Sequence, residues 1–117
     1  MPFTREILSG STNGRVIPVA ATATPGTLLH TATSTAGAVD ELWLWASNVT
    51  GTAATLTVQW GGVTDPGDHL TKQYSIAANS APMPIAQGQT MNNGLVIRAF
   101  SGTASALNVS GYVNRIS

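Results

Sequence analysis

Residues that could do chemistry are few in this chain of 117 residues, which has two histidines, five acidic residues and no cysteine. The only local cluster is Asp65, Asp68 and His69, whose side chains are of types that can bind a metal ion. Pro66 and Gly67 interrupt this cluster, and it lacks the carboxylate spacing and the closing glutamate of a calcium loop. We therefore interpret these residues as ones that form a turn, and we expect no metal site and no cofactor.

Motifs for nucleophilic catalysis and phosphate binding are absent. Serine and threonine are abundant, but there is no G-x-S-x-G elbow, and neither G-x-G-x-x-G nor a P-loop occurs. His30 follows two leucines in an expected strand, where we interpret it as a hydrogen-bonded structural histidine. We expect a protein that is not an enzyme. The alternative, a small hydrolase, requires a cleft that holds a histidine or aspartate with a shifted pKa.

The composition argues for contacts with other protein. Charged residues make up 9% of the chain, against about 25% in ordinary soluble domains. The five basic and five acidic residues balance, so we expect neither nucleic acid nor anionic lipid as a partner. No apolar run reaches the length of a membrane helix, and the first residues do not resemble a signal peptide. A weakly charged surface favours a protein that works while packed against other protein.

The central stretch, ELWLWASNVTGTAATLTVQWGG over residues 41–62, carries all three tryptophans. We interpret it as a hairpin of two antiparallel strands joined by a loop. In the second strand, residues 55–60, apolar and polar residues alternate, which predicts one buried and one solvated face.

The first strand of that stretch, residues 42–46, is apolar at every position. Leucines occupy one face, and Trp43 and Trp45 occupy the opposite face. Tryptophans on a solvated sheet are unusual, so this face should be covered. A loop, an arm or a neighbouring subunit could cover it.

Short strands with turn residues between them continue along the chain, and no segment has the spacing of an amphipathic helix. This pattern predicts an all-β fold, a single β-sandwich or jelly-roll-like domain over residues 15–117 that follows an extended N-terminal arm over residues 1–14. The expected core consists of Leu42, Leu44, Leu56, Val58, Ile97, Leu107 and Val109.

Four segments carry a resemblance to a known class: MPFTREILSGSTNGR at the start, the WLW strand, Trp60 to Gly62, and NNGLVIRAF. With these segments the chain resembles small structural proteins of tailed bacteriophages, above all the head decoration or cement proteins. The resemblance implies a β-rich homotrimer that sits on the capsid surface of the virion after synthesis in the host cytoplasm. Its implied partners are the major capsid protein and further copies of itself. The alternative is a tail, baseplate or fibre component with a carbohydrate-binding face that uses Trp45 or Trp60.

The expected interface with another subunit or with the capsid consists of apolar residues from the arm and from strands with two apolar faces. These residues are Phe3, Ile7, Leu8, Trp43, Trp45 and Phe100. The glycine-rich and serine-rich residues 9–14 would act as a flexible joint between the arm and the domain. The alternative for the arm is a first strand that pairs within its own subunit.

Overall fold

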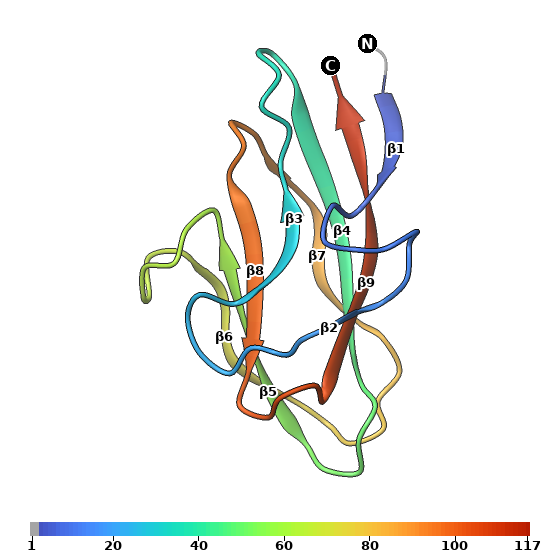
Figure 1. The fold of residues 1–117 in the computed structure, drawn as a ribbon, viewed down its shortest axis with the longest axis vertical. Coiled ribbons are helices and arrows are strands. Elements are labelled where there is room, and N and C mark those ends of the chain that lie inside the picture. The colour runs from blue at the N-terminus through green and yellow to red at the C-terminus, as the bar shows by residue number, and fades with distance from the viewer. Residues whose placement is uncertain (1–2) are drawn as a thin grey trace.

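The computed structural model describes residues 3–117 and contains two antiparallel β-sheets and no helix within that range (Figure 1). The prediction of an all-β fold is therefore confirmed. The strands are β1 (Phe3–Ile7), β2 (Ile17–Pro18), β3 (Thr27–Thr31), β4 (Val39–Asn48), β5 (Ala54–Trp60), β6 (His69–Ile76), β7 (Met83–Met91), β8 (Val96–Ser101) and β9 (Leu107–Ile116). The first sheet has the order β1-β9-β4-β7, with β2 also paired to β9, and the second sheet has the order β3-β8-β5-β6.

The core lies between the two sheets and consists of the inward side chains of each. All seven residues expected in the core are fully buried. In β4 the alternation is strict, because Leu42, Leu44 and Ala46 are buried while Trp43 and Trp45 on the other face are half-buried. This result confirms that the leucines and the tryptophans occupy opposite faces of this segment.

The expected central hairpin is wrong, because β4 and β5 do not pair. β4 pairs with β7 and β9 in the first sheet, whereas β5 pairs with β6 and β8 in the second. Residues 49–53 therefore form an arch that carries the chain from one sheet to the other. The buried amide of Asn48 stabilises this arch: Nδ2 donates to the carbonyls of Thr52 (2.9 Å) and Ile76 (3.1 Å), and Oδ1 accepts from the Thr50 N–H (2.9 Å).

The expected solvated face of β5 is also wrong, because Thr57 and Gln59 on that face are buried. The segment that precedes β3 contacts Gln59, and β6 contacts Thr57. Gln59 Oε1 accepts from the N–H of Gly26 at 2.9 Å, and its Nε2 donates to the Thr24 hydroxyl at 2.6 Å. The Thr57 hydroxyl accepts from the N–H of Gln73 at 3.0 Å. These polar side chains are tolerated inside because each one forms hydrogen bonds with protein groups.

The extended N-terminal arm is not confirmed, and its first two residues lie outside the described part of the chain. Phe3–Ile7 forms the edge strand β1, which pairs with β9 of the same chain from Phe3 opposite Ile116 to Ile7 opposite Tyr112. Figure 1 shows β1 beside β9, with the start of β1 and the end of β9 at the same end of the molecule. Leu8, expected as an interface anchor, is instead buried in the core of its own chain. This segment belongs to the domain, as the alternative interpretation held.

Candidate functional site

The outer face of the first sheet gathers aromatic and apolar side chains from three neighbouring strands. Trp43 and Trp45 of β4 both lie close to Tyr112 of β9, with ring centroids 6.4 and 6.1 Å from that of Tyr112. The Trp43 and Tyr112 rings are close to parallel, at 17°. The strand register places Ile7 of β1 opposite Tyr112 and Phe3 opposite Ile116, so these side chains share the same face. We call this set the aromatic face: Phe3, Ile7, Trp43, Trp45, Tyr112 and Ile116.

A glycine in β7 makes room for the Trp43 indole. A Cβ at Gly88 would lie 3.2 Å from Cζ2 of Trp43, and Gly88 has a φ of +85°, a conformation that L side chains rarely adopt. The indole therefore lies against the backbone of the neighbouring strand. Its Nε1–H donates to Glu41 Oε1 at 2.8 Å, which fixes the ring along its own strand. The ring position is determined before any partner binds.

Charged groups at the aromatic face are arranged around the same rings. The guanidinium carbon of Arg5 lies 4.5 Å from the centroid of the Tyr112 ring, within the range of a cation–π contact. Asn114 links the positive charge of Arg5 to the negative charge of Glu41. Its Oδ1 lies 3.5 Å from Arg5 Nε, and its Nδ2 donates to Glu41 Oε1 at 3.1 Å. Hydrogen bonds from Trp43 and then Asn114 hold the pKa of Glu41 below its ordinary value, so this carboxylate is ionised at neutral pH.

Exposure differs across the aromatic face. Phe3 is 62% exposed and Ile7 is 54% exposed, while the two tryptophans are half-buried by their neighbours. Beside Phe3 lies a shallow hollow of about 270 Å³ lined by Glu41, Asn114 and Ile116. The face thus combines fixed rings near its centre, exposed apolar side chains at the β1 edge and hydrogen-bonding groups between them. This combination suits the capture of another macromolecule, because interfaces are enriched in aromatic residues and arginine.

Four of the six expected interface residues come together here: Phe3, Ile7, Trp43 and Trp45. The other two do not. Leu8 points into the core, and Phe100 is half-buried on the outer face of the second sheet, where its ring meets His69 edge-on at 6.4 Å. The structure therefore divides the expected interface between two opposite faces and the core.

Asp40 is the centre of a buried polar network below the aromatic face. Its carboxylate accepts from Arg115 Nε at 2.8 Å and Nη2 at 3.0 Å, and from the Thr33 N–H at 2.9 Å. His30 Nε2 lies 2.8 Å from Asp40 Oδ2. Burial raises the pKa of Asp40, but the hydrogen bonds from Arg115, His30 and Thr33 outweigh burial and hold this pKa below its ordinary value. The network ties β3, β4 and β9 together.

His30 and Asp40 form the kind of pair found in hydrolytic triads, but their surroundings differ. His30 Nδ1 accepts from the backbone N–H of Ser9 at 3.0 Å, so Nε2 is the protonated nitrogen that donates to Asp40. The Ser9 hydroxyl accepts from the Thr31 N–H at 2.6 Å. Both ring nitrogens are thus occupied, and the ring is buried. This geometry confirms the expected hydrogen-bonded structural histidine and leaves the imidazole no free nitrogen for proton transfer.

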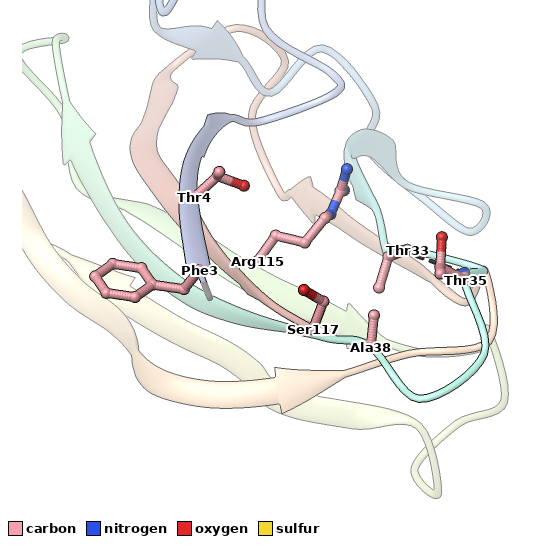
Figure 2. A pocket seen from close by; sticks show the side chains of 7 residues that line it. All are labelled: Phe3, Thr4, Thr33, Thr35, Ala38, Arg115 and Ser117. Carbon is pink, nitrogen blue, oxygen red and sulfur yellow. Dashed lines mark hydrogen bonds between the residues drawn. The ribbon is translucent and has the colours of Figure 1, made fainter. Parts of the chain in front are cut away.

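A second hollow, of about 150 Å³, lies where β1, β9 and the loop after β3 meet (Figure 2). Its lining residues are Phe3, Thr4, Thr33, Thr35, Ala38, Arg115 and Ser117. Figure 2 shows the Arg115 side chain reaching from β9 into this region, where its guanidinium already binds Asp40. The hollow is smaller than the roughly 300–1,000 Å³ typical of small-molecule sites. We place the candidate site on the aromatic face because its exposed apolar side chains and its aromatic rings suit contact with another macromolecule.

The cluster of Asp65, Asp68 and His69 is divided between different partners. Asp65 Oδ1 receives Lys72 Nζ at 2.8 Å and lies 3.5 Å from His69 Nδ1. Asp68 Oδ2 instead accepts from the Thr64 N–H at 3.0 Å, a bond within the turn. The hydrogen bond from Lys72 is the main cause of the lowered pKa of Asp65. No group of three or more metal-ligating side chains is found in residues 3–117.

Comparisons with protein-family models, with curated proteins and with solved structures give no match. In the part of the chain that the structure describes, no helix is long and apolar enough to cross a membrane. The function must therefore be argued from the aromatic face itself.

Sequence reasoning missed two residues of the aromatic face, Tyr112 and Ile116. It also missed the residues that surround the rings: Arg5, Glu41, Gly88 and Asn114. Alternation along residues 106–116 places Tyr112 on a polar face with Asn114, which gives no reason to single it out. Its importance depends on β9 pairing with β4, a contact between segments distant in the chain. The isolated glycine in β7 was the one local signal, since glycine inside a strand often marks a close approach of another group.

Proposed function

We propose that this protein is a non-enzymatic structural protein of a phage virion, a decoration or cement protein that binds the outside of the head and stabilises it. The observation that carries the proposal is the aromatic face, a prearranged apolar surface with few charges. The resemblance of the sequence to small phage structural proteins supports it. The weak overall charge supports it as well, since attachment would depend on apolar burial and main-chain pairing.

In this proposal the protein works as a homo-oligomer, most simply a trimer, with the major capsid protein as its partner. Burial of an aromatic side chain against a partner removes roughly 150–250 Å² from water, so a few such residues can dominate an interface. Trp43, Trp45 and Tyr112 provide that area on one face. Phe3 and Ile7 extend it to the edge of the sheet, where a neighbouring subunit can reach them.

The proposal predicts many copies in each virion. The first test is the abundance of this chain relative to the major capsid protein in purified particles of the virus whose genome carries the gene, measured by quantitative mass spectrometry. Copy numbers comparable to that of the capsid protein are expected. A few copies per particle, or none, would overturn the assignment to the head.

The second test locates the binding surface. Binding of the purified protein to heads that lack it should be lost or reduced at least about tenfold for Trp45→Ser, because a buried aromatic residue at an interface contributes 2 kcal/mol or more. Tyr74→Ser is the matched control, since Tyr74 is an exposed aromatic residue of β6 in the second sheet. Equal loss of binding for both variants would contradict an attachment through the aromatic face.

A second candidate function is a tail, baseplate or fibre component that binds carbohydrate. The observation in its favour is that Glu41 and Asn114, which can hydrogen-bond hydroxyl groups, lie beside the stacked rings of Trp43 and Tyr112. A glycan array probed with the labelled protein separates the two functions. Binding to one class of glycan that Trp43→Ser abolishes, together with a low copy number, would favour the tail component.

A further inference from the structure

The sheet edges of this domain are not equivalent. In residues 3–117 the edge strands are β1, β2 and β7 in the first sheet and β3 and β6 in the second. An open, regular edge presents unpaired N–H and C=O groups to any strand that approaches it, and proteins protect such edges with bulges, prolines or covering segments. A comparison of the edges therefore shows which of them is available for main-chain pairing.

Four of the edges are short, irregular or covered. β2 has only two residues, and one of them is Pro18, which cannot donate a main-chain hydrogen bond. β7 contains two register shifts and Pro84, which has no N–H to donate. β6 also contains two register shifts, and Gln73 within it has a φ of +50°. β3 contains a register shift, and the segment after β1 lies along it, with the Gly10 N–H donating to the Leu29 carbonyl at 3.0 Å.

β1 differs from these edges. Its pairing with β9 runs without a register shift from Phe3 to Ile7, and its other side has no partner strand among the described residues. Two large apolar side chains at this edge, Phe3 and Ile7, are more than half exposed on the aromatic face. Arg5 lies between them on the same face. In the described part of the chain no carboxylate lies within ion-pairing distance of Arg5.

We propose that β1 accepts an extended strand of a protein partner, which adds to the first sheet by main-chain hydrogen bonds. The partner segment carries an acidic residue opposite Arg5 and apolar residues two positions away on each side, opposite Phe3 and Ile7. Charge complementarity selects the acidic residue, and the exposed apolar pair selects its neighbours. This inference rests on the proposed function only in taking another protein as the partner.

A second copy of this chain fits the same edge poorly. Antiparallel pairing of two β1 strands keeps each side chain on its own face, so the register that sets Phe3 against Ile7 also sets Arg5 against the Arg5 of the other copy. Like charges directly opposite each other destabilise a strand pair. A strand with an acidic centre avoids this repulsion, which is why we assign the edge to a different chain.

The probe is the synthetic peptide acetyl-Thr-Val-Thr-Asp-Thr-Val-Thr-amide, whose symmetrical pattern reads the same in either strand direction. Titration into the isotope-labelled full chain should shift the backbone amide resonances of residues 3–7 and of the facing residues of β9. A peptide with lysine in place of aspartate should bind at least about fivefold more weakly, because it places like charges opposite each other. The aspartate peptide should not bind when the alternate residues whose N–H groups face β1 are N-methylated, because these groups can then no longer donate to β1.

Arg5→Glu should reverse the preference, so that the lysine peptide binds better than the aspartate peptide. Arg15→Glu is the matched control, since it makes the same change of charge at an exposed residue outside the strands and should leave the preference unchanged. Equal binding of both peptides to the unaltered chain, or shifts confined to β3, β6 or β7, would overturn the proposal. So would concentration-dependent dimerisation that places β1 in the dimer interface.

These results can be separated from those that test the proposed function. If Trp45→Ser abolishes attachment to heads while no peptide binds β1, the proposed decoration function is supported, and the proposal that β1 accepts a partner strand is wrong. If the peptides bind β1 with the expected preference while the protein is absent from virions, the proposal that β1 accepts a partner strand is supported, and the proposed decoration function is wrong.

Discussion

Asp40 connects three strands, and its carboxylate is the residue whose ionisation matters most for stability. Its pKa in the folded protein is held below the ordinary value of 3.8. A group with a lowered folded pKa contributes stability above its unfolded pKa and loses it as the pH falls through the folded pKa. The contribution of Asp40 is therefore complete at neutral pH and is lost below about pH 4.

We predict that Asp40→Asn lowers the free energy of unfolding at pH 7 by about 1.5–3 kcal/mol, the usual contribution of hydrogen bonds to a charged group. The variant should also lose less stability than the unaltered chain between pH 4 and pH 2. Thermal unfolding followed by circular dichroism across this range tests both statements. Asp65→Asn is the control, because its exposed carboxylate binds exposed Lys72 and should change stability by less than about 1 kcal/mol.

Gly88 determines how the Trp43 ring lies on the aromatic face. We predict that Gly88→Ala destabilises the fold by about 1 kcal/mol or more, because an alanine there must adopt a positive φ and its Cβ presses on the indole. The shift in ring position should appear as a change in tryptophan fluorescence. Gly37→Ala is the control, since Gly37 also has a positive φ but no atom within 4 Å of the added Cβ. An unchanged spectrum for Gly88→Ala would contradict the packing described.

At the scale of elements, the arch between β4 and β5 depends on a single buried amide. Asn48→Ala removes the donor to Thr52 and Ile76 and the acceptor for Thr50, and it takes a hydrogen-bond partner from the buried Ile76 carbonyl. We predict a loss of about 1–3 kcal/mol in the free energy of unfolding, measured by denaturant titration. Asn108→Ala is the control, because Asn108 is a half-buried residue of β9. A loss of similar size in both variants would mean that the arch does not depend on the Asn48 amide.

Two adjacent residues test whether the N-terminal segment belongs to the domain. We predict that Leu8→Ala lowers the free energy of unfolding by about 2–5 kcal/mol, as expected for a buried leucine. Ile7→Ala should change it by less than about 1 kcal/mol, because Ile7 is mostly exposed, while it should weaken binding at the β1 edge. Chemical denaturation of both variants gives the comparison. Two variants of equal stability would indicate an arm that is independent of the domain.

Alternation in the sequence predicted which side chains face inward but not which strands lie side by side. The seven expected core residues are buried because a period of two is a local property, visible in residues such as Leu56 and Val58. The hairpin was wrong because a short connection between strands can either turn back within a sheet or cross to the other sheet. The crossing to the other sheet is stabilised by the hydrogen bond from Asn48 to the Ile76 carbonyl. Ile76 is distant in the chain, so the local sequence does not show this contact.

The candidate site was predicted in part for the same reason. Trp43 and Trp45 stood out because tryptophan is rare and costly on a solvated face. Tyr112 and Arg5 join them through pairing with β9, and that pairing was not readable from local pattern. Gln59 is an opposite case. Its polar side chain was expected to face solvent, but it is buried with the Gly26 N–H as a hydrogen-bond donor, and Gly26 is distant in the chain.

At the scale of the whole molecule, charge is sparse and balanced, with 9% charged residues and a net charge of zero. Long-range attraction between such a protein and its partner is weak, so little of the binding energy can be screened by salt. We predict that raising sodium chloride from about 0.05 M to 1 M changes the affinity for phage heads by less than about fivefold. Co-sedimentation at both salt concentrations tests this, and release of most of the protein at high salt would contradict it.

Because β9 pairs with β1, β2 and β4, the order in which the strands are synthesised determines when the first sheet can fold. β9 follows β1, β2 and β4 in the chain, and it joins these three earlier strands into the first sheet. At about 5–20 residues per second, translation of the chain takes on the order of ten seconds, and for most of that time the tryptophans of β4 have no sheet to lie on. The first sheet can therefore close only after β9 has left the ribosome, and until then the tryptophans of β4 lack the cover that β9 gives them.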